Sequence, residues 1–358
     1  MRRRRLLIAF LCATALVVAV LILRFVIAAP PRYRHTFLTT ATGDPIIPFS
    51  INDHGQVVGL ARIKGGEYRI FLWDKDHSAR DLGSFHRPKH LEPLRINNVG
   101  RVTGSVRDPN GDFRAFIWDL PADKKILAAL PGKSSVPLAL NNQGQVVGFS
   151  YTSDGFPHAV LWNGDAGITD LGTLGGSASL AASINDSGQV VGFSQIASGN
   201  WHAFFWDSNT GFKDLGPTSI TTPVLDHIHL NNKAFVVGRF GSTNDQMLIS
   251  TWSQAEEARP MPSMKGIDAH PIALNDDNQF LLHVRSASLR LGGHWLFPYV
   301  EEYLWDPNEG FVPLKKNLGR RDISTFFATD INNKGQIVGR IVQKKSREPQ
   351  GVLLEPIE

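Results

Sequence analysis

Cysteine is almost absent from this sequence. The single residue of this type, Cys12, lies in an apolar N-terminal stretch, so the rest of the 358-residue chain can form no internal disulfide. Stability must therefore come from packing. The chain contains eight Trp, 33 Gly and 21 Pro, a composition that favours a turn-rich β protein with buried aromatic side chains over a helical or disordered one.

Excess positive charge is lacking outside the N-terminus. The formal net charge is +4, but five arginines lie in residues 1–24, which contain no acid, and the remainder holds 32 basic and 33 acidic side chains. A nucleic-acid-binding domain would carry a basic surface of its own. We therefore expect no nucleic-acid partner.

Linear motifs for catalysis or cofactor binding are also missing. The chain has no Gly-x-Ser-x-Gly elbow, no His-Glu-x-x-His zinc motif, no phosphate loop and no dinucleotide fingerprint. From motifs alone, we predict no cofactor, no metal site and no catalytic residue. Catalysis stays open, because distant residues can converge in a repeat fold.

The N-terminus has the pattern of a membrane anchor. Residues 1–5 form a basic tail, and Leu6 to Leu23 is an uncharged run that is followed by Arg24 and five more apolar residues. This run can span a bilayer and is longer than the apolar core of an ordinary signal peptide. We expect a transmembrane signal anchor at 6–29 and a linker at 30–35, with the rest on the extracytoplasmic side of the cell membrane. Cleavage after the anchor would give a secreted protein instead.

One pattern, Ile-Asn-x-x-Gly-Gln-Val-Val-Gly, recurs along the chain. Its Asn markers are separated by 44 to 46 residues, except for a last step of 57, and there are seven copies: Asn52, Asn97, Asn141, Asn185, Asn231, Asn275 and Asn332. A strand-like run ending in Trp lies 21 residues after most markers. Leu353 takes that position in the last copy, and Trp305 follows Asn275 by 30 residues, which indicates a nine-residue insertion.

Each copy contains four runs of strand length bounded by Gly, Asn, Asp and Ser, and four strands in about 44 residues are typical of a propeller blade. We therefore predict an all-β, seven-bladed β-propeller over residues 36–358. The chain ends after a third strand, and residues 36–43 align with the fourth-strand segment Asp170–Gly176. The N-terminal segment should therefore supply the outer strand of the last blade and close the ring.

The runs His202–Asp207, Asp170–Gly176 and Ile184–Gly192 resemble the bacterial HAF repeat family, which is named for its His-Ala-Phe sequence. The resemblance covers nearly all of residues 36–358 and implies an extracytoplasmic repeat protein, but it supplies no catalytic residues. Trp-Asp pairs such as Trp73-Asp74 are similar to those of WD-type propellers in architecture only.

Residues that recur in register are interpreted as structural. The repeated Asn and Gly suit tight turns, with calcium as the competing interpretation, and the repeated Trp and Phe suit packing between blades. His158 and His202 recur at one repeat position. Because ring symmetry separates such copies widely, we expect hydrogen bonds at strand ends from them and no metal site.

Copy-specific residues are better functional candidates, because folding alone does not require them. Two positions before the Asn marker, Arg95, His229 and Asp330 replace small residues, and His227 lies close in sequence. These four side chains are candidates for lining a ligand-binding axial channel. The insertion contributes His294, Trp295, Phe297 and Tyr299, whose rings suit stacking on sugars or contact with a protein. Paired channel residues and a covered blade end are the structural alternatives.

Three functions are compatible with these features. The leading hypothesis is a membrane-anchored binding or scaffold module for a glycan or an envelope protein. The second is a polysaccharide lyase or hydrolase that uses acid or base groups from Asp226, His227, His229 and Asp330. The third is a structural spacer without a specific ligand.

Overall fold

The computed structural model describes residues 32–357 apart from 76–77, 85–93, 121–123, 133, 165–166, 219–227, 244–245, 255, 262–267, 286–289, 292–293, 296–299, 319–321 and 346–347. The predicted basic tail and membrane anchor lie outside the described residues, and so do His227, Phe297 and Tyr299. Within the described part, no helix has the length and apolar character needed to cross a bilayer.

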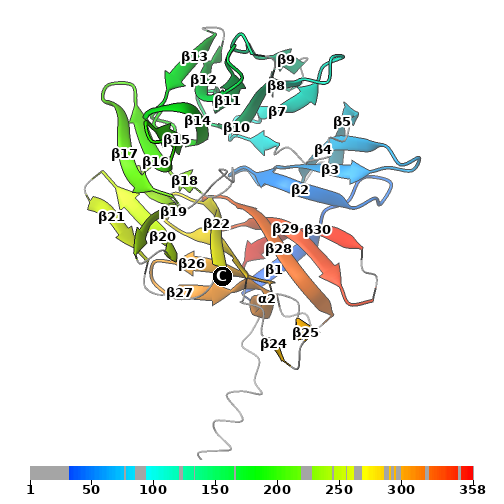
Figure 1. Ribbon diagram of the computed structural model, residues 1–358. Helices are drawn as coiled ribbons and strands as arrows, with labels where there is room; N and C mark the ends of the chain where they lie inside the picture. Colours follow the sequence, from blue (N-terminus) through cyan, green and yellow to red (C-terminus); the bar gives the residue numbers. More distant parts are fainter. Residues whose placement is uncertain are drawn as a thin grey trace, which may run out of the picture.

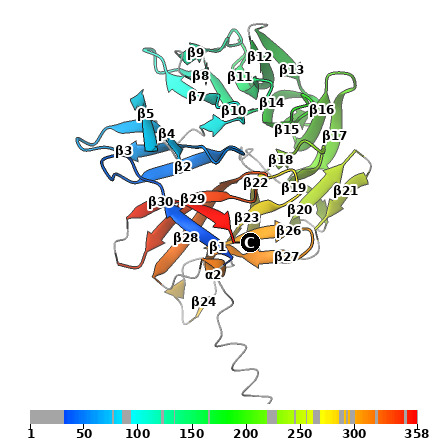
Figure 2. The same ribbon diagram turned by 180° about the vertical axis from the view of Figure 1, so that it is seen from behind.

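Seven four-stranded antiparallel sheets are arranged around a central axis (Figures 1 and 2), which confirms the predicted seven-bladed propeller. Blades 1 to 3 contain β2 (Ile46–Ile51), β3 (Val57–Arg62), β4 (Tyr68–Asp74) and β5 (Ser78–Ser84); β6 (Arg95–Ile96), β7 (Val102–Arg107), β8 (Phe113–Trp118) and β9 (Lys124–Ile126); and β10 (Ser135–Leu140), β11 (Gln145–Tyr151), β12 (Pro157–Asn163) and β13 (Ile168–Gly172).

The remaining blades follow the same order from the axis outwards. Blades 4 to 6 contain β14 (Gly175–Ile184), β15 (Val190–Ile196), β16 (Trp201–Asp207) and β17 (Gly211–Pro217); β18 (Ile228–Leu230), β19 (Val236–Thr243), β20 (Gln246–Ser253) and β21 (Glu256–Pro260); and β22 (Asp268–Leu274), β23 (Phe280–Arg285), β26 (Val300–Asp306) and β27 (Gly310–Pro313). Blade 7 contains β28 (Ile323–Ile331), β29 (Ile337–Gln343), β30 (Pro349–Pro356) and β1 (Tyr33–Phe37).

Blade 7 is completed by the N-terminal strand, as predicted. β1 pairs antiparallel with β30, with Thr36 opposite Leu353 and Phe37 opposite Val352. The strand begins at Tyr33, inside the stretch predicted as a linker, and Leu38 continues the pairing by donating its N–H to the carbonyl of Gly351. The closing strand therefore lies a few residues earlier than residues 36–43.

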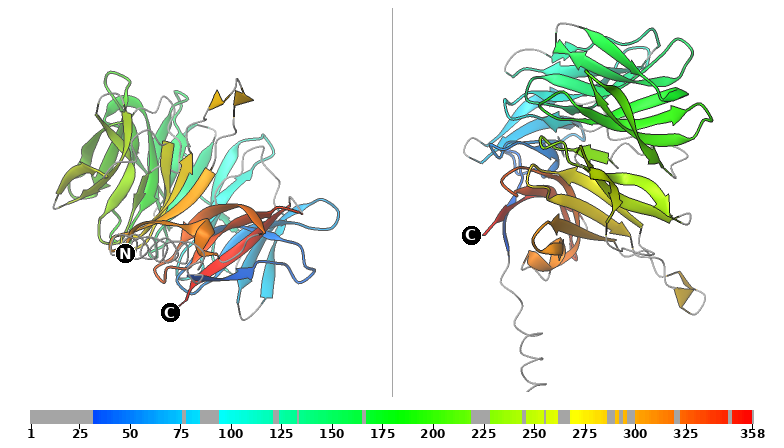
Figure 3. Two further views of the ribbon diagram at one scale, coloured as in Figure 1. Left: turned by 90° about the horizontal axis from the view of Figure 1, so that it is seen from below. Right: turned by 90° about the vertical axis from the view of Figure 1, so that its left-hand side faces the viewer.

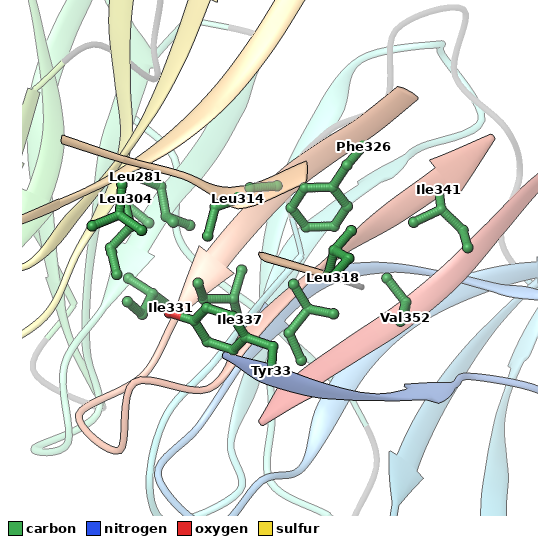
Figure 4. Close-up of a cluster of buried hydrophobic side chains, with 14 of the residues drawn as sticks. Tyr33, Leu281, Leu304, Leu314, Leu318, Phe326, Ile331, Ile337, Ile341 and Val352 are labelled. Carbon is green, nitrogen blue, oxygen red and sulfur yellow. The ribbon is translucent and has the colours of Figure 1, made fainter. Parts of the chain in front are cut away.

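The apolar core lies between neighbouring blades. The cluster at the closure joins Tyr33 of β1 to side chains of blades 6 and 7, and to Leu314 and Leu318 at the short helix α2 (Leu314–Asn317) (Figure 4). Phe326 and Ile337 in this cluster are at most 2% exposed. Burial of such side chains stabilises each interface by roughly 1.5–3 kcal/mol per residue, so β1 is held by packing as well as by its ladder.

The register corrects one part of the sequence alignment. In six blades the repeat Trp on the third strand lies opposite the first apolar residue after the repeat Gln position on the second strand. Examples are the pairs Val57–Trp73 and Phe280–Trp305. In blade 7 Ile337 faces Leu354, and Leu353 faces Val338. Leu354 therefore takes the Trp position, because the connection in the last copy is one residue longer than the fixed offset allows.

The innermost strand carries a β-bulge where it faces the second Gly of the repeat. The register shifts between Pro137 and Ala139 in blade 3, and between Ala328 and Asp330 in blade 7. A Cβ at Gly148 would lie 2.0 Å from the carbonyl oxygen of Val136, so no larger residue fits at this crossing. Bulges redirect the side chains that follow them. Asp330 is the residue directly after the bulge of blade 7.

Candidate functional site

The seven Asn markers form a closed ring of contacts between blades. In blade 3, Oδ1 of Asn141 accepts the N–H of Gln145 at 2.9 Å, and Nδ2 donates to the main-chain oxygen of Asn185 in blade 4 at 3.0 Å. The same Nδ2 bond joins each of the other six markers to the next blade, including Asn332 to Asn52 across the closure. All seven are buried. The predicted role of these Asn residues in turns is confirmed. The structure adds a second role, because each Asn also donates a hydrogen bond to the next blade; we call this bond the Asn clasp.

The turns also show why Gly recurs in them. Gly144 and four equivalent glycines have positive φ, and so do Ala234 and Asn278, which replace Gly in blades 5 and 6 with φ of 56° and 58°. Positive φ is readily adopted by Gly and tolerated by Asn. These residues are therefore accounted for by the hairpin between the first two strands.

A second polar ring lies directly after the first. Each of its members accepts the backbone N–H of its neighbour on a side-chain oxygen, and its seven members are Asp53, Asn98, Asn142, Asp186, Asn232, Asp276 and Asn333. These seven residues line an axial cavity of about 200 Å³. The Ile or Leu that precedes each Asn marker, such as Ile51, also lines this cavity. No group of three or more His, Cys, Asp or Glu within the described ranges is placed to hold a metal ion.

Other recurring polar residues pair within their own blades. His158 and His202 bond through Nδ1 to Asp170 and Asp214, both at 2.8 Å. The Asp of the Trp-Asp pairs accepts from the repeat Gln, as in Gln279 Nε2 to Asp306 at 2.7 Å. These contacts agree with the structural interpretation of residues that recur in register.

The predicted channel residues Asp330 and Arg95 lie near each other, on either side of blade 1. Asp330 Oδ2 accepts from the hydroxyl of Ser50 at 2.7 Å and from the N–H of Ile51 at 3.0 Å. Burial raises the pKa of Asp330, and the positive charge of Arg95 and these hydrogen bonds offset part of the rise. Asp330 is therefore a link between blades 7 and 1, and neither it nor Arg95 is among the residues that line the axial cavity.

His229, the third candidate in the channel, makes a different contact. Its Nε2 lies 3.3 Å from the main-chain oxygen of Pro271, which joins blade 5 to blade 6. His229 is half-buried. This contact is structural, so a role of His229 in ligand binding stays a prediction.

The clearest break in the repeat lies eight residues after the Asn marker. This position carries Arg239, His283 and Arg340 in blades 5 to 7, where blades 1 to 4 have Leu60, Ser105, Phe149 and Phe193. The residues that face it on the third strand form these pairs: Leu60–Ile70, Ser105–Ala115, Phe149–Ala159, Phe193–Ala203, Arg239–Ile249, His283–Glu302 and Arg340–Gly351. Only blade 6 places a carboxylate there.

His270, His283 and Glu302 lie opposite one another in a single row across β22, β23 and β26. Residues that are directly opposed in an antiparallel sheet project from the same face. His283 Nδ1 lies 2.7 Å from Glu302 Oε1, and the rings of His270 and His283 are 6.4 Å apart. In blade 5, Arg239 places its guanidinium nitrogen 2.8 Å from His270 Nδ1.

Blade 7 provides an aromatic surface beside this row. The ring of Phe327 stacks on His283 at 6.2 Å between centroids and 20° between planes, and the guanidinium of Arg340 lies 4.8 Å above the same ring. We call Arg239, His270, His283, Glu302, Phe327 and Arg340 the blade 5–7 cluster. The cluster was not predicted from the sequence, because the copy-specific candidates in the channel were taken from the position two residues before the Asn markers.

Glu302 is the most deeply buried charged group of the cluster. Its side chain is 1% exposed, against 20% for His283, and among the described residues its Oε2 has no hydrogen-bond partner. Burial raises the pKa of Glu302, and the hydrogen bond from His283 and the charges of His283 and Arg340 oppose the rise.

The insertion of blade 6 grows from the strands that carry this pair. Arg285 at the end of β23 faces Val300 at the start of β26, two rungs beyond the His283–Glu302 pair. Within the insertion, β24 (Arg290–Leu291) and β25 (His294–Trp295) pair with each other and stand away from the blades (Figure 3). The predicted His294 and Trp295 thus lie on a strand of the insertion.

Comparisons with known proteins add likeness of fold alone. No protein-family model and no curated protein matches the chain, so the HAF resemblance stays a sequence-based interpretation. Among solved structures, TolB from Acinetobacter baumannii is 17% identical with a TM-score of 0.44, covering 60% of this chain and 56% of TolB. XC5397 from Xanthomonas campestris, described as a gluconolactonase, is 10% identical with a TM-score of 0.40, covering 72% of this chain and 92% of its own. The sheet topology shows that the chain is a seven-bladed β-propeller, and its structural similarity to both proteins is distant.

Proposed function

We propose that the protein is a recognition module that binds an acidic saccharide at the blade 5–7 cluster. The observation that carries the proposal is the loss of the repeat pattern in three neighbouring blades, where uncharged residues (Leu, Ser and Phe in the other blades) give way to Arg239, His283 and Arg340. Folding of the repeat does not require these side chains, because the other four blades form without them.

The chemistry of the cluster suits a carboxylated or sulfated sugar. Two guanidinium groups provide forked donors for such anions, and two half-buried histidines provide further ring nitrogens. Phe327 contacts both the ring of His283 and the guanidinium of Arg340, so it holds two of these groups close together. Glu302, the one acid of the cluster, lies beside His283 and is also within reach of the charge of Arg340, and the two arginines give the cluster more basic than acidic groups.

The cluster lies near the base of the insertion, whose aromatic rings were predicted from the sequence to contact a sugar or a protein. Strands β23 and β26 carry His283 and Glu302 towards the end from which the insertion leaves. The ligand-binding role of the insertion residues Trp295, Phe297 and Tyr299 stays a prediction from the sequence. The anchor at 6–29 would hold the propeller outside the cytoplasm, where envelope or extracellular polysaccharides occur.

Binding of purified full-length protein to immobilised acidic polysaccharides tests the proposal. We expect Arg340→Ala and Arg239→Ala to weaken binding by at least about tenfold, because each removes a charge-assisted contact. The matched control is Arg107→Ala, which removes an arginine stacked on Phe113 in blade 2 and should leave affinity unchanged.

Three outcomes would contradict the proposal. Equal losses for Arg107→Ala and Arg340→Ala would show that general charge governs retention. Retention of an envelope protein in place of any saccharide would favour the scaffold alternative, and retention of nothing would favour the structural spacer.

A further inference from the structure

We infer that the His283–Glu302 pair is the base of an enzyme that cleaves uronate-containing polysaccharides by β-elimination. The inference rests on the proposed function for its ligand and adds a reaction to it. Glu302 is the positioning residue and His283 the catalytic residue in this reaction.

The geometry assigns distinct roles to the two ring nitrogens of His283. Nδ1 lies 2.7 Å from Glu302 Oε1, so a neutral ring donates its Nδ1–H to the carboxylate. This hydrogen bond selects the tautomer in which Nε2 carries a lone pair and can accept a proton. Stacking on Phe327 further restricts the orientation of the ring.

The burial of Glu302 is difficult to explain by stability. A buried carboxylate loses hydration, and here one oxygen has no partner within the described residues, so an apolar residue would serve the fold better. Six of the seven blades have Ile, Ala or Gly at this position. A buried carboxylate that orients a partly exposed histidine is the arrangement of a general base and its positioning group.

The charges around the pair favour elimination over hydrolysis. Glycoside hydrolysis in most enzymes uses two carboxyl groups that flank the bond, whereas the cluster has one, and it is engaged by His283. A base beside two arginines instead suits removal of a proton next to a carboxylate. Neutralisation of that carboxylate by a guanidinium makes the adjacent C–H bond more acidic, because it stabilises the charge that develops in the transition state.

The step balances without a further reactant. Nε2 of His283 takes the proton from C5 of the uronate, and the electrons of the C5–H bond form the C4–C5 double bond. The C4–O4 bond breaks, and the leaving oxygen takes the proton back from the imidazolium. The products are a shortened chain and an unsaturated uronate, and His283 is returned to its neutral form.

The experiment uses full-length protein in detergent with galacturonan, mannuronan, glucuronan and hyaluronan, and measures binding and the ultraviolet absorbance of the conjugated product. We expect turnover on a polymer that binds. His283→Ala should reduce the rate by at least about 100-fold with affinity largely kept, as for loss of a general base. His202→Ala, which removes a histidine in a similar pair with Asp214, should leave the rate unchanged.

Glu302→Gln separates positioning from a general structural role. It should lower the rate less than His283→Ala and shift the pH–rate profile, because the amide cannot stabilise the imidazolium. Binding of a uronate polymer without conjugated product in the wild type would overturn the inference and leave the proposed function intact. Binding of none of the four polymers would overturn the inference, and failure to bind sulfated polysaccharides as well would overturn the proposed function. An unaltered pH–rate profile in Glu302→Gln would remove the positioning role.

Discussion

The buried carboxyl group of Glu302 should make the stability of the folded protein depend on pH. Burial raises its pKa above the ordinary value, because the charged form is poorly solvated within blade 6. The folded state therefore holds the Glu302 proton more tightly than the unfolded state does. As pH rises from the ordinary carboxyl pKa through the raised folded value, the folded state becomes less stable, and above that window the loss is complete.

Glu302→Gln should abolish this contribution. We expect the difference in free energy of unfolding between the variant and the wild type to move in favour of the variant as pH increases through this window. Urea unfolding at a series of pH values measures this difference. The pKa of Asp330 is also raised. Because Asp330 is present in both proteins, its contribution cancels in the difference between their free energies of unfolding. A difference that stays constant with pH would show that Glu302 ionises normally in the folded protein.

At the scale of the element, the hairpin between the first two strands carries the contacts between blades. Asn141 is buried and donates from one Nδ2 to Asn185 in the next blade and to Gln145 in its own turn. An aspartate at this position would keep the acceptor oxygen, but it would place a second oxygen against two acceptors.

Asn141→Asp should therefore lower the free energy of unfolding by roughly 3 kcal/mol, the scale for an unpaired buried charge. The control is Asn163→Asp in the same blade. Asn163 stands where other blades have Asp74 or Asp306, so this change should be nearly neutral. Denaturant midpoints of the two variants measure the change. Similar losses of stability in both variants would show that the Asn clasp does not stabilise the contact between blades.

At the scale of the whole molecule, the ring depends on one short strand. Adjacent residues of an outer strand direct their N–H groups alternately towards and away from the partner, so His35→Pro with Thr36→Pro removes one donor from the ladder with β30. We expect a lower thermal midpoint and self-association, because β30 becomes an open sheet edge.

Thermal unfolding monitored with light scattering measures both effects. The control is a proline pair at Lys124 and Lys125 in β9, the exposed outer strand of blade 2, which does not close the ring. Equal behaviour of the two double variants would show that β1 has no special role in closure.

Much of the fold could be predicted from the sequence, because each copy repeats the same turn and strand chemistry. The seven blades follow from the spacing of the Asn markers, and the closing strand follows from the likeness of residues 36–43 to the fourth-strand segment Asp170–Gly176. The blade 5–7 cluster could not be found in this way, since the insertion displaces Glu302 by nine residues from its repeat position. Only the register of β23 with β26 places it opposite His283. Arg239, His283 and Arg340 each lie eight residues after their Asn marker, so these three residues could have been identified from the sequence.

The pairing of β1 with β30 has a mechanical consequence. Tyr33 faces Pro356, so the first rung of the ladder lies where the chain enters the propeller. A pulling force applied ahead of residue 32 and directed away from β30 would act on the residue pairs of β1 and β30 one after another, beginning at Tyr33. The same force would withdraw Tyr33 from the cluster between blades 6 and 7. The strand that locks the ring is thus the first part of the propeller to bear a pulling force.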